Sequence, residues 1–132
     1  MQIKKTRWSH YLCNYHIVWI PKYRHKVLVG EVAQELERLL REVAEKNDME
    51  IISLSVQPDH VHVFISAPPR FAPAEIVNLL KGYTSRKLRE KFPGLKSRVH
   101  SKGLWVRSYY IGTAGHVSQE TIKRYIEEAQ DL

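Results

Sequence analysis

Residues 50–66, EIISLSVQPDHVHVFIS, contain two apolar, β-branched runs on either side of Pro58-Asp59. Runs of this kind are typical of β-strands, and a Pro-Asp pair between them indicates a turn. The stretch therefore predicts one strand over residues 50–57 and a second strand over residues 60–66.

Two histidines occupy one face of the second predicted strand. Side chains two apart in a strand point the same way, so His60 and His62 lie about 6.6 Å apart along the chain, in line with Phe64. The opposite face carries Val61, Val63 and Ile65 and is expected to pack against helices. Two neutral imidazoles at this spacing can bind one metal ion. The alternative is a pair of polar residues on a sheet surface, and two ligands alone do not define a site.

The other predicted elements alternate between strand and helix. The order β-α-β-β-α-β-α predicts an α+β fold: a ferredoxin-like, split βαβ antiparallel sheet with helices on one face and an additional C-terminal helix. The remaining elements are a strand over 10–20 stopped by Pro21, a helix over 31–46, a helix from Pro73 to about Lys91, a strand over 104–111 and a final helix capped by Ser118.

The bulk composition limits the class of protein. With 132 residues, the chain is expected to form a single domain over 1–132. The 21 Lys and Arg against 14 Asp and Glu give a formal charge of +7, which favours nucleic acid or an anionic membrane surface as partner. Cys13, the single cysteine, rules out an internal disulfide and fits a reducing cytosol. No apolar run reaches the roughly 20 residues of a membrane span, and the N-terminus lacks a signal-peptide pattern. We therefore expect a cytoplasmic protein without a membrane partner.

Four blocks of the sequence resemble one family in the same order and over nearly the whole chain. They are YHIVWIPKYR, QPDHVHVFI, LLKGYTSRKL and LWVRSYYIGTAGHVSQETIKRYIEEAQ. These blocks resemble the small single-tyrosine transposases with a His-hydrophobic-His (HUH) motif, found in insertion sequences that move as single-stranded DNA. The resemblance implies a homodimeric, metal-dependent endonuclease and strand transferase that cleaves single-stranded DNA next to hairpins at the element ends. It would act through a 5′-phosphotyrosine, without a nucleotide cofactor, and would be nucleoid-associated when bound to DNA.

The resemblance also assigns roles to individual residues. Tyr125 matches the catalytic nucleophile, and His60 and His62 match two metal ligands; the expected cofactor is Mg²⁺ or Mn²⁺. The family usually supplies a third ligand, a glutamine one helical turn after the tyrosine, where this chain has Ala129. Gln130, the nearest glutamine, is the expected third ligand, although it is rotated about 140° from the tyrosine on an ideal helix, and Glu128 is the competing ligand.

The DNA contacts follow from the same blocks and from the basic charges. The expected DNA-binding residues are Lys22, Tyr23, Arg24, Lys81, Ser85 and Arg86, with Tyr23 able to stack on a base. Asp59 either orients one of the histidines or serves only as a turn residue after Pro58. Three other functions stay open: a non-catalytic module that binds single-stranded DNA or RNA, a relative that nicks DNA at genomic repeats, and an inactive element.

Overall fold

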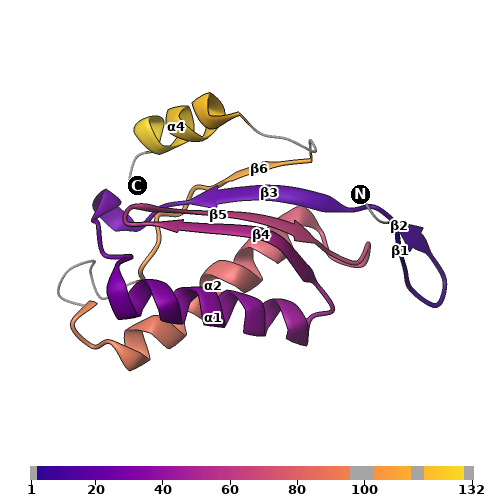
Figure 1. The fold of residues 1–132 in the computed structure, drawn as a ribbon, viewed down its shortest axis with the longest axis horizontal. Helices are drawn as coiled ribbons and strands as arrows, with labels where there is room; N and C mark the ends of the chain where they lie inside the picture. The colour runs from indigo at the N-terminus through magenta and orange to yellow at the C-terminus, as the bar shows by residue number, and fades with distance from the viewer. Residues whose placement is uncertain (1–2, 96–102, 114–117, 130–132) are drawn as a thin grey trace.

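The computed structural model of the chain describes residues 3–95, 103–113 and 118–129. Its centre is a four-stranded antiparallel sheet in the order β4-β5-β3-β6. Two helices, α1 and α2, cover one face of the sheet, and α4 lies over the other (Figure 1). The elements are β3 (Asn14–Trp19), α1 (Gly30–Lys46), β4 (Glu50–Gln57), β5 (His60–Ser66), α2 (Pro73–Lys91), β6 (Tyr110–Gly112) and α4 (Gln119–Glu128). This arrangement confirms the predicted ferredoxin-like fold.

The pairing of β3 with β5 decides which side chains share a face. Val18 lies opposite His62, and Trp19 lies opposite Val61. Directly opposed residues in an antiparallel pair project to the same side of the sheet. The histidines therefore project with Val18 to the α4 side, and Val61 projects with Trp19 to the α1–α2 side. The alternation in the sequence predicted this separation of the histidines from Val61.

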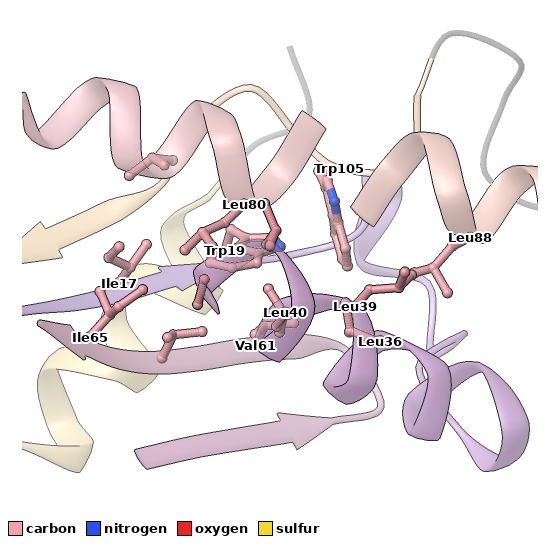
Figure 2. Packing of buried hydrophobic residues seen from close by; sticks show 14 of the residues in the cluster. Ile17, Trp19, Leu36, Leu39, Leu40, Val61, Ile65, Leu80, Leu88 and Trp105 are labelled. Carbon is pink, nitrogen blue, oxygen red and sulfur yellow. The ribbon is translucent and has the colours of Figure 1, made fainter. Parts of the chain in front are cut away.

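The main hydrophobic core fills the space between the sheet and helices α1 and α2 (Figure 2). Leu36, Leu39 and Leu40 recur at helical spacing on α1 and are all buried there. Within this core the rings of Trp19 and Trp105 meet edge to face, 5.8 Å apart between centroids. Aromatic pairs prefer this geometry because the positive ring edge meets the negative ring face.

A second, smaller core attaches α4 to the opposite face. Ser118 caps the helix, as predicted, by accepting a hydrogen bond from the backbone N–H of Thr121 at 3.1 Å. The helix then buries Ile122 and Ile126 against the sheet. Their partners are Val18, Ile20 and Val106, with Tyr110, Tyr125 and Ala129 at the edge of the cluster.

The predicted strand over 104–111 was wrong for most of its length. Only Tyr110–Gly112 pairs with β3, and Trp105 adds one isolated bridge to Pro21. Between them, the Lys81 ammonium donates to three successive backbone carbonyls, those of residues 106 to 108, at 2.7, 3.2 and 3.2 Å. A side chain thus satisfies acceptors that a neighbouring strand would otherwise satisfy.

The predicted strand over 10–20 is also interrupted. Residues 12 and 13 separate β3 from a short strand, β2 (His10–Tyr11), which pairs antiparallel with β1 (Lys4–Lys5). Figure 1 shows this two-stranded hairpin extending beyond the end of β3. The β-branched and aromatic residues of 10–20 therefore serve two sheets rather than one.

The carbonyl-bound Lys81 predicts a pH-dependent stability. Burial lowers the pKa of Lys81 to about 8. A lysine in an unfolded chain titrates near 10.4, so between these two values the unfolded state binds more protons and the free energy of unfolding rises with pH. Allowing for the partial exposure of the side chain, we expect the free energy of unfolding of wild type to rise by about 1–2 kcal/mol more than that of Lys81→Met between pH 8 and 10.5.

Urea unfolding of both proteins at several pH values measures this gain. Lys26→Met, at an exposed lysine, is the matched control and should track wild type at every pH. Parallel profiles for wild type and Lys81→Met would contradict the prediction.

Candidate functional site

Three histidines gather on the α4 face of the sheet. Besides His60 and His62, β3 contributes His16, whose Nδ1 lies 3.0 Å from Nε2 of His62. The His16 ring is buried and stacks on Phe64 with 4.0 Å between centroids. Its Nε2 has no hydrogen-bond partner among the described residues. His16 therefore fixes the ring of His62 from the neighbouring strand.

The environment of His62 keeps its imidazole neutral. Burial lowers its pKa, and the nearby rings of His16 and His60 lower it further. A neutral imidazole keeps one lone pair for a metal ion, whereas a protonated ring has none. When the Nε2–H of His62 donates to Nδ1 of His16, the lone pair that remains for a ligand is on Nδ1 of His62.

Asp59 connects His60 to a cation. One carboxylate oxygen lies 3.0 Å from Nδ1 of His60, and the other accepts from Nε of Arg24 at 3.3 Å. Burial alone would raise the pKa of Asp59, but the hydrogen bonds and charges of His60 and Arg24 outweigh it and lower the pKa. The aspartate thus stays ionised and holds His60 by Nδ1, leaving Nε2 for a ligand. Of the two histidines that Asp59 was predicted to orient, it contacts His60, and the orienting role stays a prediction.

The residues that precede this contact adopt an uncommon backbone conformation. Tyr23 and Arg24, in the 3₁₀ turn Lys22–Arg24, have φ values of 57° and 54°. Residues other than glycine are strained in this left-handed region, at about 1–3 kcal/mol each. The turn brings Arg24 onto Asp59 and leaves the Tyr23 ring 58% exposed.

A pocket of about 270 Å³ lies between His60 and α4. Two cations, Arg24 and Lys123, and two acids, Asp59 and Glu127, line it, with the apolar face of α4 completing the wall. The lining residues are Arg24, Asp59, His60, Gln119, Ile122, Lys123, Ile126 and Glu127. Of the two predicted third ligands, Glu128 is exposed at the end of α4 and does not line this pocket, and Gln130 lies outside the described residues.

Tyr125 lies on the flank of α4, away from the pocket lining. Its hydroxyl is 3.2 Å from Oγ of Ser108, in the segment before β6. Burial raises the pKa of Tyr125, and the contact with Ser108 opposes that rise. In this conformation the phenol is protonated at neutral pH and is separated from the pocket that His60 lines.

The other predicted DNA-binding residues differ in their surroundings. Lys81 is held by carbonyls, and Ser85 is buried with its Oγ accepting from the backbone N–H of Leu104 at 3.1 Å. Arg86 is exposed on α2, and Lys22 is half-buried. A DNA contact through any of these residues stays a prediction, and Arg86 has the most open position for it.

Comparison with known proteins identifies the chain. The family model described as "Transposase IS200 like" matches residues 9–129. The chain belongs to this family of transposases. The transposase is 41% identical over 131 residues to the ISDra2 transposase TnpA of Deinococcus radiodurans, covering 99% of this chain and 94% of that protein. It is 34% identical to the transposase for insertion sequence element IS200 of Salmonella typhimurium, covering 93% of this chain and 81% of the relative.

Solved structures agree with this assignment. A crystal structure from Deinococcus radiodurans, solved as a candidate transposase, superposes with a TM-score of 0.88 at 38% identity over 98% of this chain and 99% of that chain. A REP-associated tyrosine transposase bound to a REP hairpin shares the fold, with a TM-score of 0.56 at 12% identity over 93% of this chain and 69% of that chain. In the described part of the transposase, no helix has the length and apolar character that crossing a membrane requires.

Proposed function

We propose that this transposase is a metal-dependent endonuclease and strand transferase that acts on single-stranded DNA. The observation that carries the proposal is the state of the histidine pair. Each ring has one nitrogen held by the protein, His60 by Asp59 and His62 by His16, and the other nitrogen left for a ligand. Histidines that bind metals are commonly oriented in this way through their second nitrogen.

The donor set favours Mg²⁺ or Mn²⁺ over zinc. Among the described residues no three His, Cys, Asp or Glu side chains are placed to hold one metal ion, so His60 and His62 would hold the ion together with DNA and water oxygens and one further protein group. Glu127, which shares the pocket with His60, joins Gln130 and Glu128 as a candidate for that group. A bound ion would polarise the scissile phosphate and stabilise the departing 3′-oxygen.

In the proposed cleavage step, Tyr125 is the nucleophile. Its phenolic oxygen attacks the phosphorus, the bond from phosphorus to the 3′-oxygen breaks, and the phenolic proton passes to solvent while the 3′-oxygen leaves as a hydroxyl. The product is a 5′-phosphotyrosine. Because that link is itself a phosphodiester, another 3′-hydroxyl can attack it, release the tyrosine and join new DNA ends without ATP.

The position of Tyr125 favours a homodimer. The hydroxyl lies on Ser108 and not in the pocket beside His60 of the same chain. A nucleophile must come within about 3–3.5 Å of the reacting atom. A second copy that presents its own α4 to this histidine pair would meet this requirement, as would a shift of α4 on its own sheet.

The proposed substrate is single-stranded DNA that carries a hairpin near the cleavage site. Arg24 and Lys123 provide positive charge at the pocket, and Tyr23, which precedes Arg24 in the chain, is exposed. Cations pair with phosphates, and exposed aromatic faces stack on unpaired bases. The REP-associated tyrosine transposase that shares the fold was solved bound to a REP hairpin, which is consistent with this substrate class.

A covalent trapping experiment tests the proposal. The protein is incubated with labelled single-stranded DNA from the ends of its own element, with Mg²⁺ or with EDTA, and resolved on a denaturing gel. We expect an adduct that requires Mg²⁺ and maps to Tyr125 by mass spectrometry. Tight DNA binding without an adduct under Mg²⁺ or Mn²⁺ would favour a binding module or an inactive element.

Asp59→Asn tests the orienting contact. The amide keeps the shape of the carboxylate but loses its charge, so it holds both His60 and Arg24 less firmly. We expect Mn²⁺ affinity to fall by about 10- to 100-fold, as for other partners behind metal-binding histidines. Calorimetric titration with Mn²⁺ measures it, with Asp48→Asn at an exposed aspartate as control. If Asp59→Asn binds Mn²⁺ as tightly as wild type, Asp59 serves only as a turn residue after Pro58.

A further inference from the structure

The β1–β2 hairpin is a separate feature at the end of the sheet opposite the histidine pocket (Figure 1). Its turn is closed by a hydrogen bond from the Thr6 N–H to the Ser9 carbonyl at 2.7 Å and by a contact of 2.6 Å between their hydroxyls. The tip of the hairpin is therefore Arg7 and Trp8. A two-stranded ribbon of this length adds little to the core, so its tip needs another explanation.

Trp8 at the tip of the hairpin is unusual in its exposure to solvent. The chain has three tryptophans, of which Trp19 and Trp105 are buried at 0% and 6% exposure, whereas Trp8 is 84% exposed. An indole ring is a large apolar surface that proteins generally bury or place at an interface. A single exposed apolar residue is common, so the surroundings of Trp8 decide what it can bind.

Those surroundings are cationic. The Arg7 guanidinium lies 4.8 Å from the centroid of the Trp8 ring, and Lys5 and His10 lie on the two strands beside it. No acidic residue precedes Glu31 in the sequence, and Glu50, an acid that reaches this hairpin from β4, pairs with Lys4 at 2.8 Å. Residues 5–10, which include this tip, line a hollow of about 570 Å³. An aromatic platform beside phosphate-binding cations is the arrangement with which proteins grip unpaired nucleotides.

The location separates this surface from the cleavage chemistry. β5 runs from His60 to Ser66, about 20 Å, and the hairpin lies beyond the Ser66 end, next to the start of β3. A nucleotide at Trp8 would therefore lie away from the histidine pocket of the same chain. It would belong to DNA that flanks the cleaved phosphate.

We propose that the β1–β2 hairpin is a second contact for single-stranded DNA, in which Trp8 stacks on an unpaired base and Arg7 and Lys5 hold its phosphates. The proposal rests on the proposed function only in taking single-stranded DNA as the substrate. It adds a binding site for the DNA strand that flanks the cleavage site. This site would retain the cleaved strand while a new DNA end is joined.

Intrinsic fluorescence tests the contact directly, because Trp8 is the one tryptophan of the three that faces solvent. The full-length protein is titrated with the oligonucleotide dT12 and with a blunt 12-base-pair duplex. We expect dT12 to quench the emission and the duplex not to do so. Trp8→Phe should remove this signal, which assigns it to Trp8.

Binding by the variants measures the contribution of the contact. Trp8→Ala is expected to weaken dT12 binding by roughly 5- to 100-fold. Arg7→Gln should lower the slope of log affinity against log salt by about 0.7, the value of one phosphate contact on a single strand. Ile3→Ala, at an exposed apolar residue just before the hairpin, is the matched control and should bind as wild type.

Two results would overturn the inference. One is dT12 binding by Trp8→Ala equal to that of wild type; the other is emission that changes with protein concentration alone, which would assign Trp8 to a contact between copies of the chain. The adduct at Tyr125, formed on a substrate without a long flanking arm, is measured in parallel. If wild type forms the adduct but Trp8→Ala binds dT12 as wild type does, only this inference is rejected. If wild type forms no adduct but Trp8→Ala weakens dT12 binding, only the proposed function is rejected.

Discussion

Tyr125→Phe is expected to abolish DNA cleavage, with a rate lower by at least about 10⁴-fold, while DNA affinity stays within about twofold of wild type. The change removes one hydroxyl, which is the proposed nucleophile, and removal of a nucleophile can cost a factor of this size or more. The ring and its packing at the edge of the α4 cluster are preserved. Adduct formation and a binding titration on the same DNA measure the two quantities.

Tyr110→Phe is the matched control for this change. Tyr110 packs at the edge of the same cluster and is also half-buried, so its loss of a hydroxyl should leave cleavage intact. An adduct in Tyr125→Phe would assign the nucleophile to another residue, and mapping would identify it. Loss of DNA binding in a folded Tyr125→Phe protein would also contradict the role assigned here.

The second large effect is expected from His60→Ala combined with His62→Ala. Metal-dependent cleavage should disappear, and Mn²⁺ affinity should fall by more than about 100-fold, because loss of an outer partner of a ligand alone costs about 10- to 100-fold. Cleavage assays over a range of Mn²⁺ and Mg²⁺ concentrations and calorimetric titration measure the loss. DNA binding without metal should persist, since Arg24 and Lys123 are unchanged.

His10→Ala controls for the loss of an imidazole elsewhere. His10 is exposed on the β1–β2 hairpin, at the other end of the sheet from the pocket, so Mn²⁺ binding should equal that of wild type. Cleavage by the double variant at wild-type rates, with the fold intact by circular dichroism, would remove the metal site from the proposal.

The sequence was sufficient for the parts of the fold with a clear hydrophobic period. The strands at 50–57 and 60–66 and the helix from Pro73 to Lys91 have the predicted bounds, because alternation and helical spacing report directly on burial. The segment 104–111 failed this test. The segment is apolar, but the Lys81 ammonium donates hydrogen bonds to its backbone carbonyls. The spacing of apolar side chains in the sequence does not show which groups the backbone will bond.

The candidate site was predictable only in part. The sequence pairs His60 with His62 because they share a strand, and Asp59 adjoins them along the chain. His16 was missed, since its approach to His62 depends on the register between β3 and β5. The alternation in β3, which puts His16 and Val18 on one face, was the available signal. Ser108 and Glu127 were missed for the same reason, because each meets its neighbours through tertiary packing.

The small core beneath α4 gives the molecule two unequal levels of stability. The main core includes residues of both other helices and of β3, β4 and β5, whereas α4 is attached chiefly by two buried isoleucines, worth about 1.5–3 kcal/mol each before the entropy of ordering the helix. The helix can therefore detach at a small fraction of the cost of global unfolding, so its amides should exchange with solvent long before those of β3 or β5. The proposed nucleophile thus belongs to the least firmly attached of the described helices, and the histidines belong to the sheet.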